Sequence, residues 1–380
     1  AAAYPGAYPW LVERDFVVFG QRGTEFAEPA LMCPEYRQAI KDSGDKIRAA
    51  QDCRARLRSA GTELSNYNSE TSAADIEDLR RVLNVDAWTL YGLSYGTRLA
   101  LTYARAFPDN VAAMVLDSPL PPNARYDDAS ATNFESALRA VAKDCTKQPN
   151  CAAAFPNLEA RFFQTIESVT ETPLSVDFGN RRATGADLAG LIDMTSPKGI
   201  REAPFKMDAI SRRDPDVLAS LGEPPAASNF AWGMRWSVWC AEAWPFSDRS
   251  RSPGPGPTLG GFESAAIDPE ICGIWEVPPL GADIVAPVVS DIPTLIFAGE
   301  FDPLTPPSWG QLAAETLSDA LIVSVRGEGH LPTQQWAGDG CAMALAGAFV
   351  QDPETVLDHS PGDFCVFAKP APRYLTGAVE

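Results

Sequence analysis

A serine in a glycine-flanked turn constrains the fold of this chain more than any other feature. Residues 92–96 read Gly-Leu-Ser-Tyr-Gly and lie between an apolar run at 87–90 and a helix-like run at 97–104. The order predicts a strand, a sharp turn and a helix, with glycines where larger side chains would collide with the strand or the helix. Ser94 would then point its hydroxyl above a sheet, at the positive end of the following helix. A purely structural Gly-Ser turn is the alternative.

The chain has only two histidines, which narrows the choice of a general base. His330 lies in a glycine-bearing loop after the strand-like run 320–325, where it could reach a serine at the edge of a sheet. His359 lies in the polar segment 357–361, and we interpret it as a surface residue.

Two aspartates compete for the role of the acid that orients the histidine. Asp302 follows the buried-strand pattern at 293–299, whereas Asp117 ends the apolar run at 114–116 and is interpreted as a cap for the loop that follows. Ser94, Asp302 and His330 reproduce the order of nucleophile, acid and histidine of α/β-hydrolases.

The rhythm of apolar segments predicts the domain organisation. A short buried strand is expected at 15–20, and strands alternate with helices up to 117, as in a mostly parallel sheet flanked by helices. This alternation of strands and helices stops after the proline-rich segment 119–122 and resumes at Pro293. We therefore predict an α/β-hydrolase core in two segments, 1–122 and 287–380, with a largely helical cap at 123–286 inserted between late strands.

Composition excludes several classes of protein. A formal net charge of −19 argues against nucleic-acid binding, which needs clustered lysine and arginine. No apolar run approaches the roughly 18 residues of a membrane span. With two histidines and no Cys-x-x-Cys pair, we expect no metal and no other cofactor.

The eight cysteines are best explained as disulfides formed in an oxidising compartment. Buried free thiols in a cytosolic enzyme are the alternative, and the connectivity cannot be read from the sequence. The absence of an Asn-x-Ser/Thr site fits a secreted or periplasmic bacterial protein. The pairs closest in the sequence, which we expect to be linked, are Cys33–Cys53, Cys145–Cys151, Cys240–Cys272 and Cys341–Cys365.

Three segments resemble one group of serine peptidases. Residues 16–23 resemble the "FDQRG" segment of proline iminopeptidases and tripeptidyl-aminopeptidase-like α/β-hydrolases, and residues 92–97 are typical of the same group. The stretch from 299–306 through His330 and Cys341 is similar to its C-terminal module. The resemblance implies a serine exopeptidase, usually secreted, that removes residues or short peptides from free N-termini. It also implies relatives that have become esterases.

The chain departs from the family pattern near its start. Gly20 stands where the family usually has an aspartate, and no His-Gly-Gly-Pro-Gly-like loop precedes the segment around Val17. In the family that loop supplies half of the oxyanion hole. We therefore expect N-terminal strands of the sheet to be missing from this chain. The active protein is expected to include an upstream segment of the same precursor, with this loop and at least two strands.

The expected reaction is acyl transfer from a peptide or ester substrate, with the Tyr95 N–H donating to the oxyanion. An aminopeptidase needs a carboxylate for the substrate's ammonium group. Glu242, between Trp239 and Trp244, is the candidate, and a surface glutamate on a cap helix is the structural alternative. An esterase would use the same tryptophans as an apolar pocket. A non-catalytic binding protein with a hydrolase fold is the third possibility.

Overall fold

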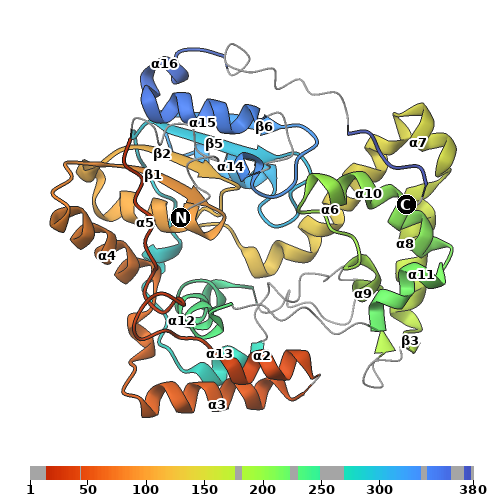
Figure 1. The fold of residues 1–380 in the computed structure, drawn as a ribbon, viewed down its shortest axis with the longest axis horizontal. Coiled ribbons are helices and arrows are strands. Elements are labelled where there is room, and N and C mark those ends of the chain that lie inside the picture. The colour runs from red at the N-terminus through yellow and green to blue at the C-terminus, as the bar shows by residue number, and fades with distance from the viewer. Residues whose placement is uncertain are drawn as a thin grey trace.

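A four-stranded parallel sheet forms the centre of the fold in the computed structural model (Figure 1). Its strands lie side by side in the order β1 (Trp88–Leu93), β2 (Val111–Asp117), β5 (Thr294–Gly299) and β6 (Ala320–Val325). Every neighbouring pair is parallel, so the carboxyl ends of all these strands meet at one edge of the sheet. The structure describes residues 14–42, 44–175, 182–222, 230–248, 269–334, 340–360 and 372–377.

Helices cover both faces of this sheet. Along β2, Met114 and Leu116 pack with one apolar cluster, and Ala113 and Val115 pack with another on the opposite face. A strand buried on both faces reads as a continuous apolar run, as this one does. The helices on the first face are α4 (Ser69–Val82), α5 (Tyr95–Ala106) and α14 (Pro307–Ala314), and those on the second are α15 (Cys341–Gln351) and α16 (Pro353–Leu357).

A long, mostly helical segment separates β2 from β5 in the sequence. Its first part packs around a large cluster that includes Phe134, Phe162 and Ile200 (Figure 1, right). The elements of this part are α6 (Tyr126–Thr146), α7 (Pro149–Ala154), α8 (Leu158–Glu171), β3 (Leu174–Ser175), β4 (Arg182–Ala183), α9 (Gly185–Ala189), α10 (Pro197–Ser211) and α11 (Pro215–Leu218).

The second part of the insertion packs with the start of the chain rather than with the sheet. Here α12 (Trp232–Glu242) and α13 (Pro269–Trp275) share one apolar cluster with α2 (Pro34–Lys41) and α3 (Lys46–Ser59). The four helices lie together below the sheet in Figure 1. The sequence pattern had assigned α2 and α3 to the core segment 1–122, but their apolar side chains meet the tryptophans of α12 and α13 instead.

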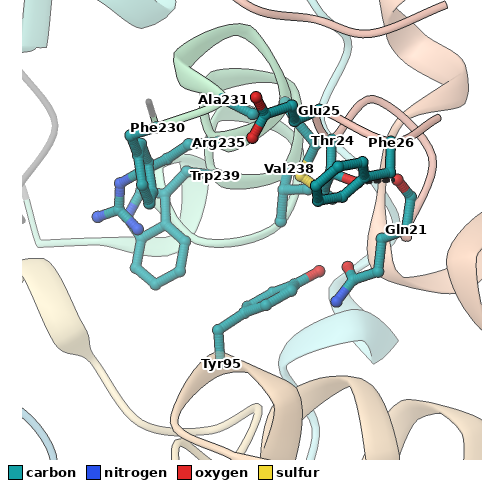
Figure 2. A pocket seen from close by; sticks show the side chains of 11 residues that line it. Gln21, Thr24, Glu25, Phe26, Tyr95, Phe230, Ala231, Arg235, Val238 and Trp239 are labelled. Carbon is teal, nitrogen blue, oxygen red and sulfur yellow. Dashed lines mark hydrogen bonds between the residues drawn. The ribbon is translucent and has the colours of Figure 1, made fainter. Parts of the chain in front are cut away.

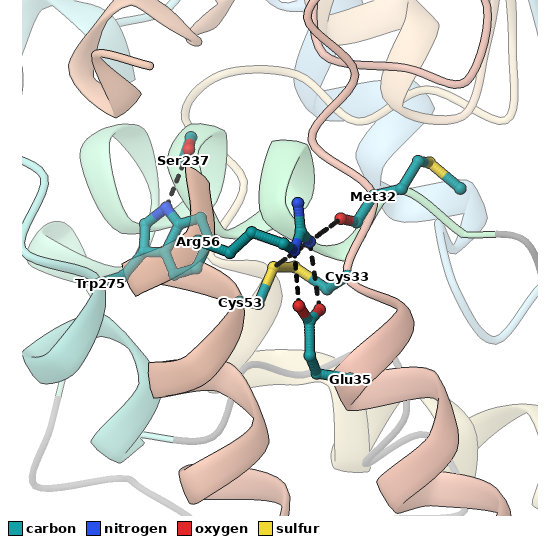
Figure 3. Close-up of a disulfide and its surroundings, with 7 residues drawn as sticks. All are labelled: Met32, Cys33, Glu35, Cys53, Arg56, Ser237 and Trp275. Atoms are coloured by element: carbon teal, nitrogen blue, oxygen red, sulfur yellow. Dashed lines mark hydrogen bonds and ion pairs between the residues drawn. A yellow bond between two sulfur atoms is a disulfide. The ribbon is translucent and has the colours of Figure 1, made fainter. Parts of the chain in front are cut away.

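Three of the expected disulfides are present: Cys33–Cys53, Cys145–Cys151 and Cys240–Cys272. Cys341 is also disulfide-bonded, whereas its expected partner Cys365 lies outside the described residues. Figure 3 shows the first bridge joining α2 to α3, with Arg56 donating to Glu35 and to the Met32 carbonyl beside it. The bridge and these bonds fix the helical hairpin.

The strand expected at 15–20 is not formed. These residues are irregular rather than extended in a sheet, and Val17, Val18 and Phe19 are exposed. A strand is stabilised by pairing with a neighbour, and β1 remains an edge strand of the described sheet. The prediction was wrong because an apolar run reports strand propensity but not the presence of a pairing partner.

In the part of the chain that the structure describes, no helix has both the length and the apolar character needed to cross a bilayer.

Candidate active site

Ser94 occupies the sharp turn that the sequence predicts. β1 ends at Leu93, α5 begins at Tyr95, and Ser94 between them has φ 52° and ψ −119°, a conformation that is strained for a residue with a side chain. A Cβ at Gly92 would lie 2.7 Å from the Gly96 carbonyl oxygen, so glycine is required there. A Cβ at Gly96 would meet nothing within 4 Å among the described residues, so the expected collision occurs on one side only.

Asp302 and His330 form a hydrogen-bonded pair. Asp302 Oδ2 lies 2.8 Å from His330 Nδ1, and the aspartate side chain is fully buried. Its other oxygen accepts the backbone N–H groups of Leu304 and Thr305 at 2.8 and 3.0 Å. These bonds hold the carboxylate in one orientation, so Nδ1 carries the proton and Nε2 is left as the basic nitrogen.

The end of β2 connects the serine to the histidine. Ser94 N donates to the Asp117 carbonyl at 3.0 Å, and Leu331 N, the residue after His330, donates to Ser118 Oγ at 2.9 Å. Ser94 and His330 therefore lie on either side of the dipeptide Asp117–Ser118, at the carboxyl edge of the sheet. The structure thus places Ser94 and the Asp302–His330 pair, the residues expected to form the triad, at the same edge of the sheet.

Asp117 is close to this pair but does not bond to the imidazole, since His330 Nδ1 bonds to Asp302. Burial raises the pKa of Asp117 to about 7, an effect that hydrogen bonds from Thr333 and the nearby His330 partly offset. His359 lies apart from the site on the exposed surface after α16, with Nδ1 2.7 Å from the Thr355 carbonyl. The interpretation of His359 as a surface residue is confirmed.

A pocket of about 360 Å³ opens beside Tyr95, the residue after Ser94 (Figure 2). The Tyr95 phenol, Trp239 and Arg235 border it, and the Arg235 guanidinium lies 4.7 Å from the Trp239 ring centroid. Trp239 Nε1 donates to Asp127 at 2.8 Å, which fixes the indole. The described residues that line it are Gln21, Thr24, Glu25, Phe26, Tyr95, Phe230, Ala231, Met234, Arg235, Val238 and Trp239.

Of the residues expected to bind substrate, Trp239 lines this pocket, whereas Glu242 and Trp244 do not. Trp244 is half-buried in the short helix η5 (Trp244–Phe246). Glu242 is fully buried, and its Oε2 pairs with Arg98 Nε at 3.1 Å. Because its charge is already paired inside the protein, Glu242 is not placed to receive a substrate ammonium group.

Glu242 instead connects α12 to α4 and α5. Its carboxylate accepts the backbone N–H and the hydroxyl of Ser69 at the start of α4, and Ser69 Oγ lies 2.9 Å from the Tyr95 hydroxyl. Sequence reasoning missed Arg98. The signal was a charged residue within the apolar run of α5, since a buried charge requires a partner.

The Tyr95 backbone N–H lies at the first turn of α5, where amides have no acceptor within the helix. It is thus available to a developing oxyanion, together with the positive end of the helix. Among the described residues, no group of three histidine, cysteine or acidic side chains could hold a metal ion.

The architecture and these residues define an α/β-hydrolase. A family model described as "alpha/beta hydrolase fold" matches residues 13–333, and the chain belongs to this family.

Among curated relatives, the serine protease Hip1 of Mycobacterium tuberculosis is 25% identical over 316 residues, which cover 76% of this chain and 60% of Hip1. The chain thus spans about 60% of the length of Hip1. The tripeptidyl aminopeptidase of Streptomyces lividans is 30% identical over 122 residues, 29% of this chain and 22% of that protein. The proline iminopeptidase of Xylella fastidiosa is 27% identical over 168 residues, 44% of this chain and 47% of that protein. The resemblance to such peptidases is therefore confirmed.

Proposed function

We propose that this protein is a serine hydrolase that works through an acyl-enzyme on Ser94. The observation that carries the proposal is the His330–Asp302 pair at the same sheet edge as the strained Ser94 turn. His330 Nε2 takes the Ser94 proton as Oγ attacks a carbonyl carbon, and Asp302 stabilises the resulting imidazolium. His330 then protonates the leaving group, and water, activated by the same nitrogen, releases the acyl group.

The substrate class we favour is a peptide with a free N-terminus, as the names of the relatives suggest. Glu25 supports this assignment, because it is the one carboxylate among the described residues that line the pocket next to Tyr95. It is exposed, so it can pair with an incoming ammonium group without the cost of a preformed buried charge. Glu25 takes the role that the sequence pattern had given to Glu242.

A carboxylesterase is the second candidate. The pocket walls are largely apolar, with Met234, Val238 and Trp239 on α12, and Glu242 is not available for an ammonium group. Such walls suit an apolar acyl or alcohol group.

The disulfides favour export of the protein to an oxidising compartment, outside the cell or in the periplasm. The outer edge of β1 has no paired strand among the described residues, and an edge of this kind can accept a further strand.

Labelling with a fluorophosphonate probe tests the mechanism, and a set of substrates tests the class. The probe should modify Ser94 in the native protein and nothing in Ser94→Ala. Aminoacyl and tripeptidyl amides should be cleaved faster than the same amides with a blocked N-terminus, and Glu25→Gln should raise KM for the free-amine substrates only. Equal rates on blocked and free substrates, with fast nitrophenyl-ester hydrolysis, would favour the esterase. No labelling and no turnover would favour a binding protein.

A further inference from the structure

The loop that carries His330 is anchored through four backbone N–H groups between residues 327 and 333. Their acceptors lie in three parts of the protein: the turn after β5, the insertion and the end of β2. The bonds are Gly327 N to Glu300 Oε2 at 2.9 Å, His330 N to the Thr195 carbonyl at 3.0 Å, Leu331 N to Ser118 Oγ at 2.9 Å and Thr333 N to Asp117 Oδ2 at 3.0 Å. The last two acceptors are adjacent residues at the end of β2.

Two residues at this junction have left-handed backbone conformations. Ser118 has φ 57° and Leu331 has φ 62°, values that are unfavourable for residues with a side chain. The hydrogen bond from Leu331 N to Ser118 Oγ joins the two strained residues directly. Strain of this kind persists only where surrounding contacts impose it, and Leu331 is the residue next to His330.

Asp117 binds Thr333, three residues after His330 in the same loop. Its side chain is fully buried, and Oδ2 accepts both the backbone N–H and the hydroxyl of Thr333. Thr333 Oγ1 in turn accepts the Tyr91 hydroxyl at 2.6 Å, and Tyr91 lies on β1, three residues before Ser94. This network links the strand of the nucleophile to the loop of the histidine.

We propose that Asp117 and Ser118 are positioning residues for His330, which hold its loop in the strained turn that presents the imidazole to Ser94. The inference rests on the proposed function of Ser94 and deepens it. Neither side chain bonds to the imidazole, whose Nδ1 bonds to Asp302. Loss of either anchor should therefore lower kcat and leave KM nearly unchanged, because a reacting group is displaced while the substrate pocket is intact.

The Ser118→Gly variant distinguishes a role of Ser118 in positioning His330 from a role in folding. Glycine accepts a positive φ without strain, so the variant should keep a melting temperature within a few degrees of the wild type. Leu331 N loses its acceptor, and kcat should fall about 10- to 100-fold, as expected for a displacement of about 1 Å.

Ser290→Gly is the matched control, because Ser290 Oγ also accepts a backbone N–H, that of Ile292 at 3.1 Å, before the start of β5. It should lower stability without lowering kcat.

A second measurement does not depend on turnover. In a His359→Asn background the chain has one histidine, so the ¹H–¹⁵N signals of the imidazole report on His330 alone. The Nδ1–H resonance should shift or broaden in Ser118→Gly and in Asp117→Asn, and stay unchanged in Ser290→Gly. An unchanged resonance and an unchanged kcat in both β2 variants would overturn the proposal. If the Ser94 probe experiment fails but the resonance still moves, the mechanism is wrong and the positioning of His330 stands.

Discussion

Arg98 and Glu242 form an ion pair in which both side chains are buried, with Nε and Oε2 3.1 Å apart. Arg98 lies on α5, one turn after the Ser94 elbow, and Glu242 is the last residue of α12. Arg98 Nη2 also donates to the Glu242 carbonyl at 3.2 Å. The helix that follows the nucleophile and the helix that lines the pocket are thus joined by paired buried charges.

Glu242→Gln should destabilise the fold by about 3–5 kcal/mol, because it leaves the Arg98 charge buried without a counter-ion. Denaturant unfolding measures this loss. Glu135→Gln is the control: its pair with Arg139 is exposed, so its loss should cost less than about 1 kcal/mol. Turnover of free-amine peptides and of esters should fall in parallel in Glu242→Gln. A rise in KM restricted to free-amine peptides would restore Glu242 as the ammonium receptor.

Asp302→Asn should lower kcat by a factor on the order of 10⁴, since an amide in this position favours the wrong tautomer of His330. His330→Ala should be as damaging as Ser94→Ala, whereas His359→Ala should leave activity unchanged. Steady-state kinetics on one peptide substrate compares all of these variants with Asp117→Asn. For Asp117→Asn we expect kcat to fall only about 10- to 100-fold, because the substitution displaces His330 without removing its partner Asp302. A greater loss in Asp117→Asn than in Asp302→Asn would transfer the role of the acid to β2.

Asp117 should make the protein less stable as the pH rises from about 4 to about 7. Burial raises the pKa of this carboxyl from 3.8 to about 7 in the folded state, with His330 and Asp302 as the nearby titrating groups. Within this window the folded protein binds the proton more tightly than the unfolded chain, so the free energy of unfolding decreases with increasing pH. Urea unfolding of wild type and Asp117→Asn at several pH values measures the effect. The difference in the free energy of unfolding between the two proteins should change between about pH 4 and about pH 7. A constant difference over this range would contradict a raised pKa for Asp117.

Mass mapping without reduction should find Cys33–Cys53, Cys145–Cys151, Cys240–Cys272 and Cys341–Cys365. The first three links are present in the structure. Replacing both Cys240 and Cys272 by alanine should cost about 2–4 kcal/mol of stability. Several free thiols in the exported protein would argue against an oxidising compartment.

The sequence was sufficient to predict the sheet strands near the site, the elbow and the approach of His330 to Asp302. These features depend on local patterns: an apolar run, a glycine-flanked turn and polar residues at strand ends. The strand at 15–20 could not be predicted reliably, because strand formation depends on a pairing neighbour that a local apolar run does not reveal.

The role of Glu242 shows a second limit. A glutamate between two tryptophans suggests a binding site, and only the three-dimensional structure reveals that Arg98, more than a hundred residues away, already neutralises it. The contribution of Asp117 was hidden for the same reason, since its partner Thr333 comes from the far end of the chain.

The packing of α2 and α3 against α12 and α13 has a consequence for biosynthesis. Leu31 and Leu57 share their apolar cluster with Trp236 and Trp275, so the surface that buries the early hairpin comes from much later in the chain. Each helix pair has its own disulfide: Cys33–Cys53 in the first pair and Cys240–Cys272 in the second. Each disulfide can therefore form within its own helix pair before the two pairs pack together. A cross-linked α2–α3 hairpin has less conformational freedom before α12 and α13 cover its apolar side.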